Sequence, residues 1–258
     1  MYIKYLIILS FITFLIIYLR FINKYNCICN KNRNININEK AYLADKFEVK
    51  NYINKYFPYI KTAKVYYHTN NYNDLLNFNY DKLPNKFVIK VNNSAGKNGV
   101  LIIHDKKTFK KEKLNKFYYF SYVHGNWPII SNIFGMEKHY KKIKKVYFIE
   151  EYLDYNINEY KFIIIDGKIK YITVDSNMCK NVYDHNFNKI KDKYMAYAQC
   201  NYVDDKPKQL ELMKNFCYDF IKKTKFKFLR IDLYVSKNEV YLGELTFTPN
   251  NCIAFNNL

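Results

Sequence analysis

One stretch constrains the fold of this chain more than any other: FLRIDLYVSKNEVYLGELTF, residues 228–247. Apolar residues alternate with Arg230, Asp232 and Tyr234 along its first half, with the period of two that a half-buried strand requires. A polar turn at residues 236–239 separates this strand from a second one, which predicts a hairpin. The chain must therefore contain an antiparallel sheet that has one polar and one apolar face.

The polar face of this hairpin carries residues that can perform chemistry. Glu244 and Thr246 share a face of the second strand by the same period. Two carboxylates, Asp232 and Glu244, can hold Mg²⁺ ions that bridge phosphate oxygens, while Arg230 binds the charge that develops during phosphoryl transfer. A surface ion pair is the alternative. The first interpretation is favoured because lysine otherwise dominates and Arg230 is the only arginine after Arg33, which fits a need for planar, bidentate geometry.

A glycine-containing loop forms the second informative stretch, KFVIKVNNSAGKNGV. The apolar runs Phe87–Val91 and Val100–Ile103 predict two strands, and Gly96 and Gly99 lie between them although the chain has only 6 glycines. Such a loop either lets backbone N–H groups approach a phosphate beside Lys90 or simply makes a hairpin turn, and these residues leave both open. Because the lysine precedes the glycines on a strand, the order differs from that of a P-loop and of a protein kinase.

The remaining periodic segments predict an α+β protein. Apolar spacing predicts helices over residues 41–56 and 210–222, and a buried strand over residues 146–149. Two apolar runs flank Asp166 and Gly167, a dipeptide that accepts the positive φ of a tight turn, so a further hairpin is expected there. No internal repeat is evident.

The amino terminus has a different composition. Residues 5–19, YLIILSFITFLIIYL, carry no charge, which predicts a short hydrophobic anchor within residues 1–23, followed by a polar linker over residues 24–40. A cleaved signal peptide is the rival interpretation, but no small-residue cleavage site follows. Basic residues are more numerous after this segment than before it, so we expect a single-pass membrane protein whose large domain faces the cytosol.

Charge and cysteine content exclude several classes. The formal net charge of +19 comes from lysines spread through every segment, which indicates a solvated surface, and no nucleic-acid-binding motif accompanies it, so a nucleic-acid partner is not expected. The six cysteines lack paired metal spacing and are sparse for a disulfide scaffold, so a reducing compartment is expected. The histidines lack ligand spacing and are interpreted as structural or surface residues.

These stretches together resemble the ATP-grasp superfamily, most closely its TupA-like branch, which is linked to cell-surface polysaccharide biosynthesis. The similarity covers residues 45–250, with DKFEVKNYI, LPNKFVIKVNNSAGKNGV, EKHYKKIKKVYFIEEYL, EYKFIIIDGKI and LRIDLYVSKNEVYLGELTFTP in the family's order. The resemblance implies an ATP-grasp domain over residues 41–258. Two α+β lobes, near residues 83–149 and 150–252, would clasp a nucleotide between antiparallel sheets.

The resemblance also implies roles for individual residues. Lys50 and Lys90 would contact nucleotide phosphates, with Lys90 also acting in catalysis, and Arg230 would stabilise the phosphoryl group in transfer. Asp232 and Glu244 would be Mg²⁺ ligands. Ser94, Gly96 and Gly99 would belong to a mobile flap over the phosphates. The adenine-binding linker between the lobes would consist of Glu150, Glu151, Tyr152 and Leu153. Glu159 would bind the ribose.

By resemblance, the chain would be an ATP- and Mg²⁺-dependent carboxylate–amine ligase that acts through an acyl phosphate on a sugar acid, an amino acid or a glycan bearing one. Many superfamily members have asparagine where Thr246 stands, so a second metal ion is in doubt. A membrane-tethered scaffold without turnover is the alternative, and a glycosyltransferase or sugar kinase is a weaker one. Little chain precedes residue 83, so the acceptor surface would come from unidentified residues or a partner.

Overall fold

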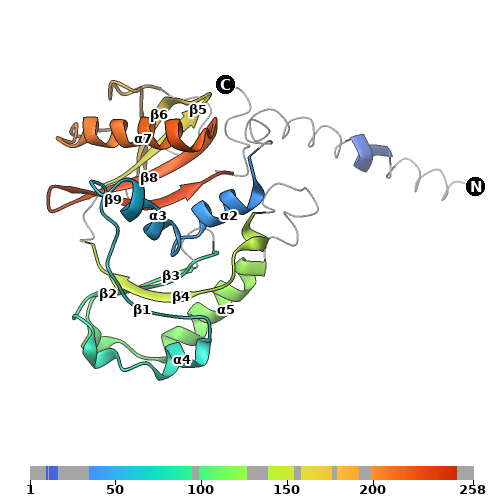
Figure 1. The fold of residues 1–258 in the computed structure, drawn as a ribbon, viewed down its shortest axis with the longest axis vertical. Coiled ribbons are helices and arrows are strands. Elements are labelled where there is room, and N and C mark those ends of the chain that lie inside the picture. Colours follow the sequence, from blue (N-terminus) through green and yellow to red (C-terminus); the bar gives the residue numbers. More distant parts are fainter. Residues whose placement is uncertain are drawn as a thin grey trace, which may run out of the picture.

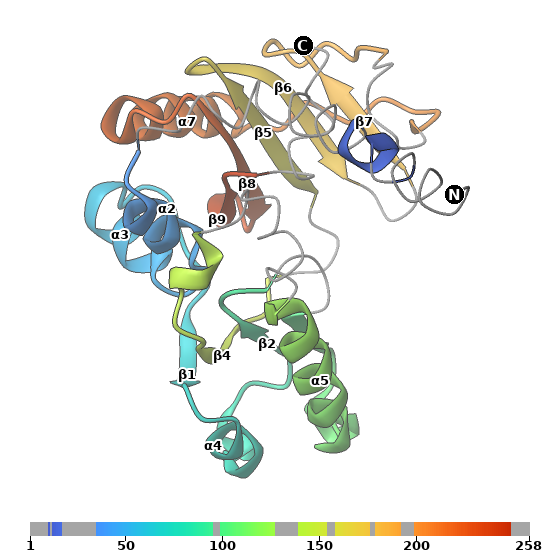
Figure 2. The same ribbon diagram turned by 90° about the vertical axis from the view of Figure 1, so that its right-hand side faces the viewer.

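The computed structural model contains two antiparallel sheets that lie one above the other (Figure 1). Figure 2, turned by 90°, shows the short helices α2 and α3 at the level between the two sheets, on one side. Helices and antiparallel sheets together confirm the expected α+β class. The structure describes residues 10, 12–16, 35–94, 99–126 (of 120–126 the backbone alone), 139–153, 158–175, 179–191 and 199–248.

The first sheet has four strands in the order β1-β4-β2-β3. Phe87, Ile89 and Val91 of β2 are buried in one core with Leu114 and Phe117 of the long helix below the sheet, whereas the alternate positions of β2 face the second sheet. The strands predicted at residues 87–91 and 100–103 are confirmed. The elements of this half are β1 (Val65–Thr69), α4 (Tyr72–Asn77), η2 (Tyr80–Lys82), β2 (Phe87–Val91), β3 (Val100–Ile103), η4 (Lys106–Thr108), α5 (Glu112–Asn126), η5 (Tyr140–Lys142) and β4 (Tyr147–Glu151).

The second sheet has five strands in the order β7-β6-β5-β8-β9. Helix α7 covers its outer face, because Met213, Phe216 and Phe220 recur at helical spacing and are fully buried with Phe162 and Ile231 of the sheet. The polar residues of the same strands lie on the opposite face, which is directed at the first sheet. The bounds are β5 (Glu159–Ile165), β6 (Lys168–Asp175), β7 (Lys180–Tyr183), α7 (Leu210–Thr224), β8 (Phe228–Ser236) and β9 (Glu239–Thr246).

Both predicted hairpins of the second sheet are confirmed by their turns. Asp166 and Gly167, between β5 and β6, have φ of 52° and 72°. Lys237 and Asn238, between β8 and β9, have φ of 50° and 65°. Two successive residues with positive φ match the right-handed twist of the flanking strands. These turns fix the register that places the polar residues of neighbouring strands opposite each other.

Residues 41–56 form two helices rather than the single predicted one: α2 (Ile37–Ala44) and α3 (Val49–Tyr56). Asp45 interrupts them because its carboxylate accepts hydrogen bonds from the backbone N–H groups two and three residues later, at 2.8 and 3.1 Å. The other carboxylate oxygen accepts from the side-chain amide of Asn92 at 2.8 Å. This break turns the chain between the helices toward the first sheet.

A β-bulge in β9 sets the phase of the polar face. Asp232 lies opposite Glu244, but the next residue of β8 pairs with Leu242, so Gly243 is an extra residue in β9. The bulge lets Leu242 face the core and Glu244 face the first sheet, although a regular strand would put both on the same side. Glycine is required because a Cβ there would overlap the ring of Tyr234.

The predicted amino-terminal anchor lies largely outside the described residues. Of residues 1–23 the structure describes only 10 and 12–16, which are helical. Across the described part of the chain, we find no helix whose length and apolar content would let it cross a membrane. The anchor therefore stays a prediction from the sequence, and the polar linker predicted at residues 24–40 overlaps the start of α2.

His139 occupies a buried position next to η5. Its side chain packs against the rings of Tyr140 and Phe247, with centroid distances of 4.4 and 6.0 Å. Burial, with a smaller contribution from the charge of Lys40, lowers the pKa of His139 to about 4. The residue is thus a neutral part of the core, as the sequence predicted for the histidines.

We predict that His139 makes the fold less stable in acid. Because its pKa is lower in the folded chain than in the unfolded one, the stability it contributes is complete above pH 6.5 and is lost as the pH falls toward about 4. Its share of the loss between pH 7 and pH 5 is about 2 kcal/mol. Urea unfolding at both pH values measures the effect.

Two variants control this measurement. Between pH 7 and pH 5, His139→Phe should lose about 2 kcal/mol less stability than the parent does, whereas His185→Phe, at an exposed position, should change in the same way as the parent. Equal pH dependence in the parent and His139→Phe would contradict the assignment.

Candidate active site

Four polar side chains of β8 and β9 form one bonded group, which contains the ion pair that the sequence left open as the alternative. Arg230 donates from Nε and Nη2 to the two carboxylate oxygens of Asp232, both at 2.6 Å. The same Nη2 donates to Glu244 at 2.8 Å, and the hydroxyl of Thr246 donates to that Glu244 oxygen, also at 2.8 Å. The guanidinium group therefore bridges two carboxylates from neighbouring strands, which is the planar, forked geometry that lysine cannot provide.

The group continues onto β5 through Glu159. Tyr234 donates from its hydroxyl to Glu159 at 2.6 Å, and the ammonium of Lys161 pairs with the other oxygen of the same carboxylate. Lys161 lies directly opposite Asp232 in the strand register. The predicted ribose ligand, Glu159, is thus placed on the same face as the predicted metal ligands.

Asp175, at the end of β6, extends the network toward the sheet edge. Its Oδ2 pairs with Lys161 at 2.9 Å and with Lys180 of β7 at 2.8 Å. Burial alone would raise the pKa of Asp175, but the charges of these lysines outweigh it and hold the pKa below its usual value. Oδ1 is buried without a hydrogen-bond partner in the described part of the chain.

Lys46 joins this face to the first sheet. It lies in the turn between α2 and α3, and its ammonium is 3.2 Å from Glu244 of the second sheet. The same ammonium donates to the backbone carbonyl of Ser94, three residues after the end of β2, at 2.6 Å. One side chain therefore contacts both halves of the molecule at the carboxylate pair.

The two predicted phosphate-binding lysines converge on one carboxylate of the first sheet. Lys50 of α3 and Lys90 of β2 lie 2.7 and 2.5 Å from the two oxygens of Glu150. Lys50 also donates to the carbonyl of Ala63 at 2.9 Å. Burial of Glu150 opposes ionisation, but the charges of Lys90 and Lys50 outweigh it and lower its pKa, while burial lowers the pKa of Lys50.

The pKa values of the two predicted metal ligands shift in opposite directions. Burial raises the pKa of Asp232 to about 6, against the opposing charges of Arg230 and Lys161. Burial also acts on Glu244, but there Lys46 and Arg230 prevail and lower the pKa to about 2. Burial would lower the pKa of Arg230, but Asp232 and Glu244 raise it. Glu244 is thus the more firmly ionised carboxylate of the pair.

The predicted flap begins and ends in tight packing. Ser94 is fully buried, and its hydroxyl has no hydrogen-bond partner among the residues that the structure describes. A Cβ at Gly99 would overlap the Ser94 side chain and would lie 2.9 Å from a methyl carbon of Val91, so only glycine fits. Gly96 lies outside the described residues, and its predicted role in nucleotide binding remains a prediction.

The predicted adenine-binding linker follows the last strand of the first sheet. Glu151 donates from its backbone N–H to the carbonyl of Lys64 at 2.8 Å. Tyr152 packs edge-on against the ring of His104 at a centroid distance of 5.6 Å, and Leu153 is half-buried. The roles of these residues in adenine recognition stay predictions, and Glu150 has the two lysines as its immediate partners.

The carboxylate pair fits Mg²⁺. Within the described ranges no group of three histidine, cysteine, aspartate or glutamate residues could hold a metal ion by itself. Mg²⁺ bound together with a nucleotide uses one or two carboxylates and completes its shell with phosphate and water oxygens. Asp232 and Glu244, paired across β8 and β9 on one face, provide that donor set.

A cavity of about 690 Å³ lies beside this site, between α3, the loop after it and β1. Lys50 is one of its lining residues, whereas Asp232 and Glu244 are not. The converging charged side chains, rather than this cavity, therefore identify the candidate site.

The fold and this site together define an ATP-grasp protein. A biotin carboxylase from Campylobacter jejuni, solved as a complex with β,γ-ATP, is similar with a TM-score of 0.51 and 11% identity, over 84% of this chain and 43% of that one. D-Alanine–D-alanine ligases from Helicobacter pylori and Bacillus anthracis have TM-scores of 0.44 and 0.45 and identities of 18% and 20%. The matches to these ligases cover 79% and 83% of this chain but only 54% and 59% of theirs.

The chain belongs to the TupA-like ATP-grasp family, whose profile matches residues 26–257. The suspected resemblance is thus confirmed over nearly the whole globular part. No sequence among curated proteins matches the chain.

Three lysines of the site were not predicted from the sequence. Lys161 carried a usable signal, because it lies two residues after Glu159 and so shares its face of a strand. Lys46 was hidden inside a predicted helix, and only the break at Asp45 brings it to the carboxylates. Lys180 depends on the pairing of β6 with β7, which no local pattern encodes.

We predict that Glu150→Gln destabilises the fold by about 3 kcal/mol, because it removes the carboxylate that compensates two partly buried ammonium groups. Chemical denaturation at pH 7.5 measures the change. As a control, Glu211→Gln removes an exposed partner of Lys214 and should cost less than about 1 kcal/mol. Equal effects of the two substitutions would contradict the central position of Glu150.

Proposed function

We propose that this protein is an ATP- and Mg²⁺-dependent ligase that joins a carboxylate to an amine through an acyl phosphate. One observation carries the proposal: Arg230, Asp232 and Glu244 form a single group on one sheet, and Lys46 connects that group to the other sheet. Family membership supports ATP as the nucleotide. The chain covers little more than half of the D-alanine–D-alanine ligases it resembles, so its activity and substrates are proposals.

The reaction needs positioned charge rather than a protein nucleophile. A carboxylate oxygen of the acid attacks the γ-phosphorus of ATP and ADP leaves; the amine then attacks the acyl carbon, inorganic phosphate leaves and the amine nitrogen loses a proton. Lys50 and Lys90 hold phosphate oxygens, and Arg230 binds the oxygens of the group in transfer. Mg²⁺ bound at Asp232 and Glu244 would neutralise phosphate charge.

The substrates follow from the family resemblance. We propose an acid on a sugar, an amino acid or a surface glycan, and a role in the synthesis or modification of a surface polysaccharide. The hydrophobic segment within residues 1–23 supports attachment to a membrane with the domain on the cytosolic side. A partner or further residues would supply the acceptor surface.

A scaffold without turnover is the second candidate, and one observation favours it. Asp232 and Glu244 are already paired with Arg230, and Glu244 also with Lys46, so both carboxylates have cationic partners within the chain itself. Thr246 donates to Glu244 where many superfamily members have asparagine, which reduces the donor set for a second metal ion.

We predict that MgATP binds the full chain and that Glu244→Ala abolishes the Mg²⁺ dependence of binding, because it removes a metal ligand. Calorimetric titrations with ATP, each run with and without Mg²⁺, measure the effect. Glu239→Ala is the matched control, because Glu239 is an exposed carboxylate at the far end of the same strand. A folded parent that binds no MgATP would overturn the nucleotide proposal.

We predict that Arg230→Lys binds MgATP but loses at least about 100-fold in turnover, because lysine cannot contact two groups with one planar fork. ADP release is followed while pairs of acids and amines are screened with the parent, and the variant is then tested on the active pair. MgATP binding with no ADP release for any pair would favour the scaffold. Unchanged turnover in Arg230→Lys would contradict its role in transfer.

A further inference from the structure

A disulfide bond joins Cys179 to Cys200, which differs from the expectation that the cysteines are reduced. The two residues are 21 positions apart, and no local sequence pattern pairs them. The bond forms because Cys179 directly precedes β7 and the segment 199–204, here called the strap, lies beside that strand and runs in the same direction, with a parallel bridge between Lys180 and Gln199. Their Cα atoms are thereby 5.1 Å apart, within the range that a disulfide requires.

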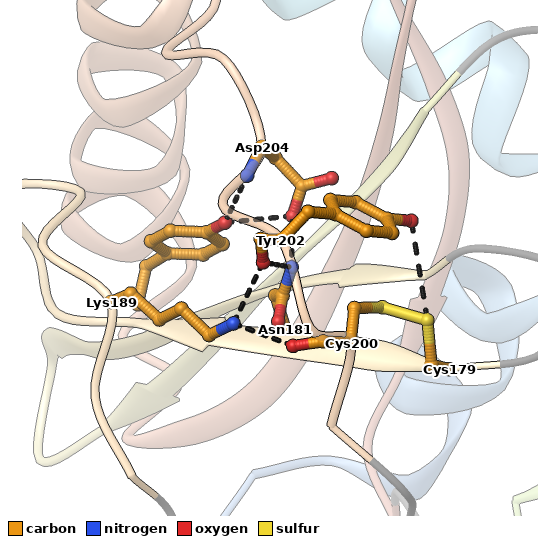
Figure 3. The surroundings of a disulfide bond; sticks show 7 residues. Cys179, Asn181, Lys189, Cys200, Tyr202 and Asp204 are labelled. Atoms are coloured by element: carbon orange, nitrogen blue, oxygen red, sulfur yellow. Dashed lines mark hydrogen bonds between the residues drawn. A yellow bond between two sulfur atoms is a disulfide. The ribbon is translucent and has the colours of Figure 1, made fainter.

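Side chains of β7 and the loop after it also hold the strap (Figure 3). Asn181 donates to the carbonyl of Tyr202 and to the carboxylate of Asp204, each at 2.9 Å. Lys189 donates to the carbonyls of Cys200 and Tyr202, each at 2.7 Å. The strap is therefore attached by side-chain hydrogen bonds and one covalent bond, and it covers the outer edge of the sheet at β7.

The disulfide lies one residue from the charged network of the site. Lys180 follows Cys179 and pairs with Asp175 at 2.8 Å, and Asp175 pairs with Lys161 at 2.9 Å. Lys161 is in register with Asp232. The ion pairs thus lead from the residue next to the disulfide to Lys161, whose neighbour on the adjacent strand, Asp232, is close enough for its charge to act on Lys161.

We propose that the Cys179–Cys200 disulfide is a thiol-sensitive clamp: its reduction releases the strap from β7 and loosens the Lys180–Asp175 arm of the site. Release of the strap stands independently of the proposed function, whereas the effect on the site rests on it. Without the covalent bond, only hydrogen bonds hold the strap, and these can break and re-form while the rest of the protein stays folded. Cys179 is then no longer tethered to the strap, so Lys180, the next residue, is held less firmly against Asp175.

The reduction balances as a thiol–disulfide exchange. Cys179 is half-buried and Cys200 is buried, so the thiolate of a dithiol reductant attacks the sulfur of Cys179 and Cys200 leaves as a thiolate. The second thiol of the reductant then displaces Cys179. Two electrons pass to the pair, each cysteine gains a proton, and the reductant becomes a cyclic disulfide.

The test uses the full chain purified without reductant. Non-reducing peptide mapping by mass spectrometry should find the peptides of Cys179 and Cys200 linked. Hydrogen exchange with and without dithiothreitol should then become about tenfold faster or more in residues 199–204 after reduction, while α7 stays protected. Titration with MgATP should give a Kd about threefold or more higher for the reduced protein.

The Cys179→Ala/Cys200→Ala double variant is the control. It should resemble the reduced parent without treatment, and dithiothreitol should have no further effect on it, which excludes the other cysteines as the cause. Free thiols at both positions in the untreated parent, or unchanged exchange in the strap on reduction, would overturn the clamp. Faster exchange with an unchanged Kd would overturn its link to the site, whereas a parent that binds no MgATP in either state would overturn the proposed function alone.

Discussion

The site depends on the guanidinium of Arg230, because it contacts the buried carboxylate of Asp232 and the partly exposed carboxylate of Glu244, on neighbouring strands, at 2.6 to 2.8 Å. Carboxylates so close together repel each other, and burial raises the cost of their charge. A cation with a fixed fork can hold both ionised while leaving their outer lone pairs directed at the first sheet. The β-bulge at Gly243 is the backbone feature that allows this contact, since it rotates Glu244 to the side of Arg230.

Most of the architecture follows from local patterns, and the parts that do not follow depend on contacts between distant segments. The hairpin turns at Asp166 and at Lys237 were predictable because few residues accept positive φ in succession. The position of Asp232 opposite Glu244 was predictable because β8 and β9 are neighbours in sequence. The break at Asp45 was not, because the hydrogen bonds that stabilise it include one from Asn92, 47 residues away. The disulfide likewise depends on the return of the strap to β7.

Two lysines that lie close together in the sequence form ion pairs with carboxylates of different sheets. Lys46 pairs with Glu244 of the second sheet, and Lys50, in the helix that follows, pairs with Glu150 of the first. Because Lys46 lies in the short turn before α3 and Lys50 lies in α3, a movement of this helix would change the distance from each lysine to its carboxylate at the same time. The Asp45 break thus serves more than local geometry. In a continuous helix, Lys46 and Lys50 would lie on the same face because they are four residues apart, whereas the break lets them pair with carboxylates of different sheets.

Each carboxylate that a ligand would meet already has a cationic partner in the chain, and this shapes how a ligand would enter the site. Each lysine ammonium has three N–H donors, so phosphate oxygens would share Lys50 and Lys90 with Glu150, and a metal ion would share Asp232 and Glu244 with Arg230. Keeping both lysines near Glu150 avoids leaving that buried carboxylate without a cation. The raised pKa of Asp232 and the lowered pKa of Glu244 indicate that the two ligands would respond unequally to a bound metal ion, with Asp232 the more dependent on a cation.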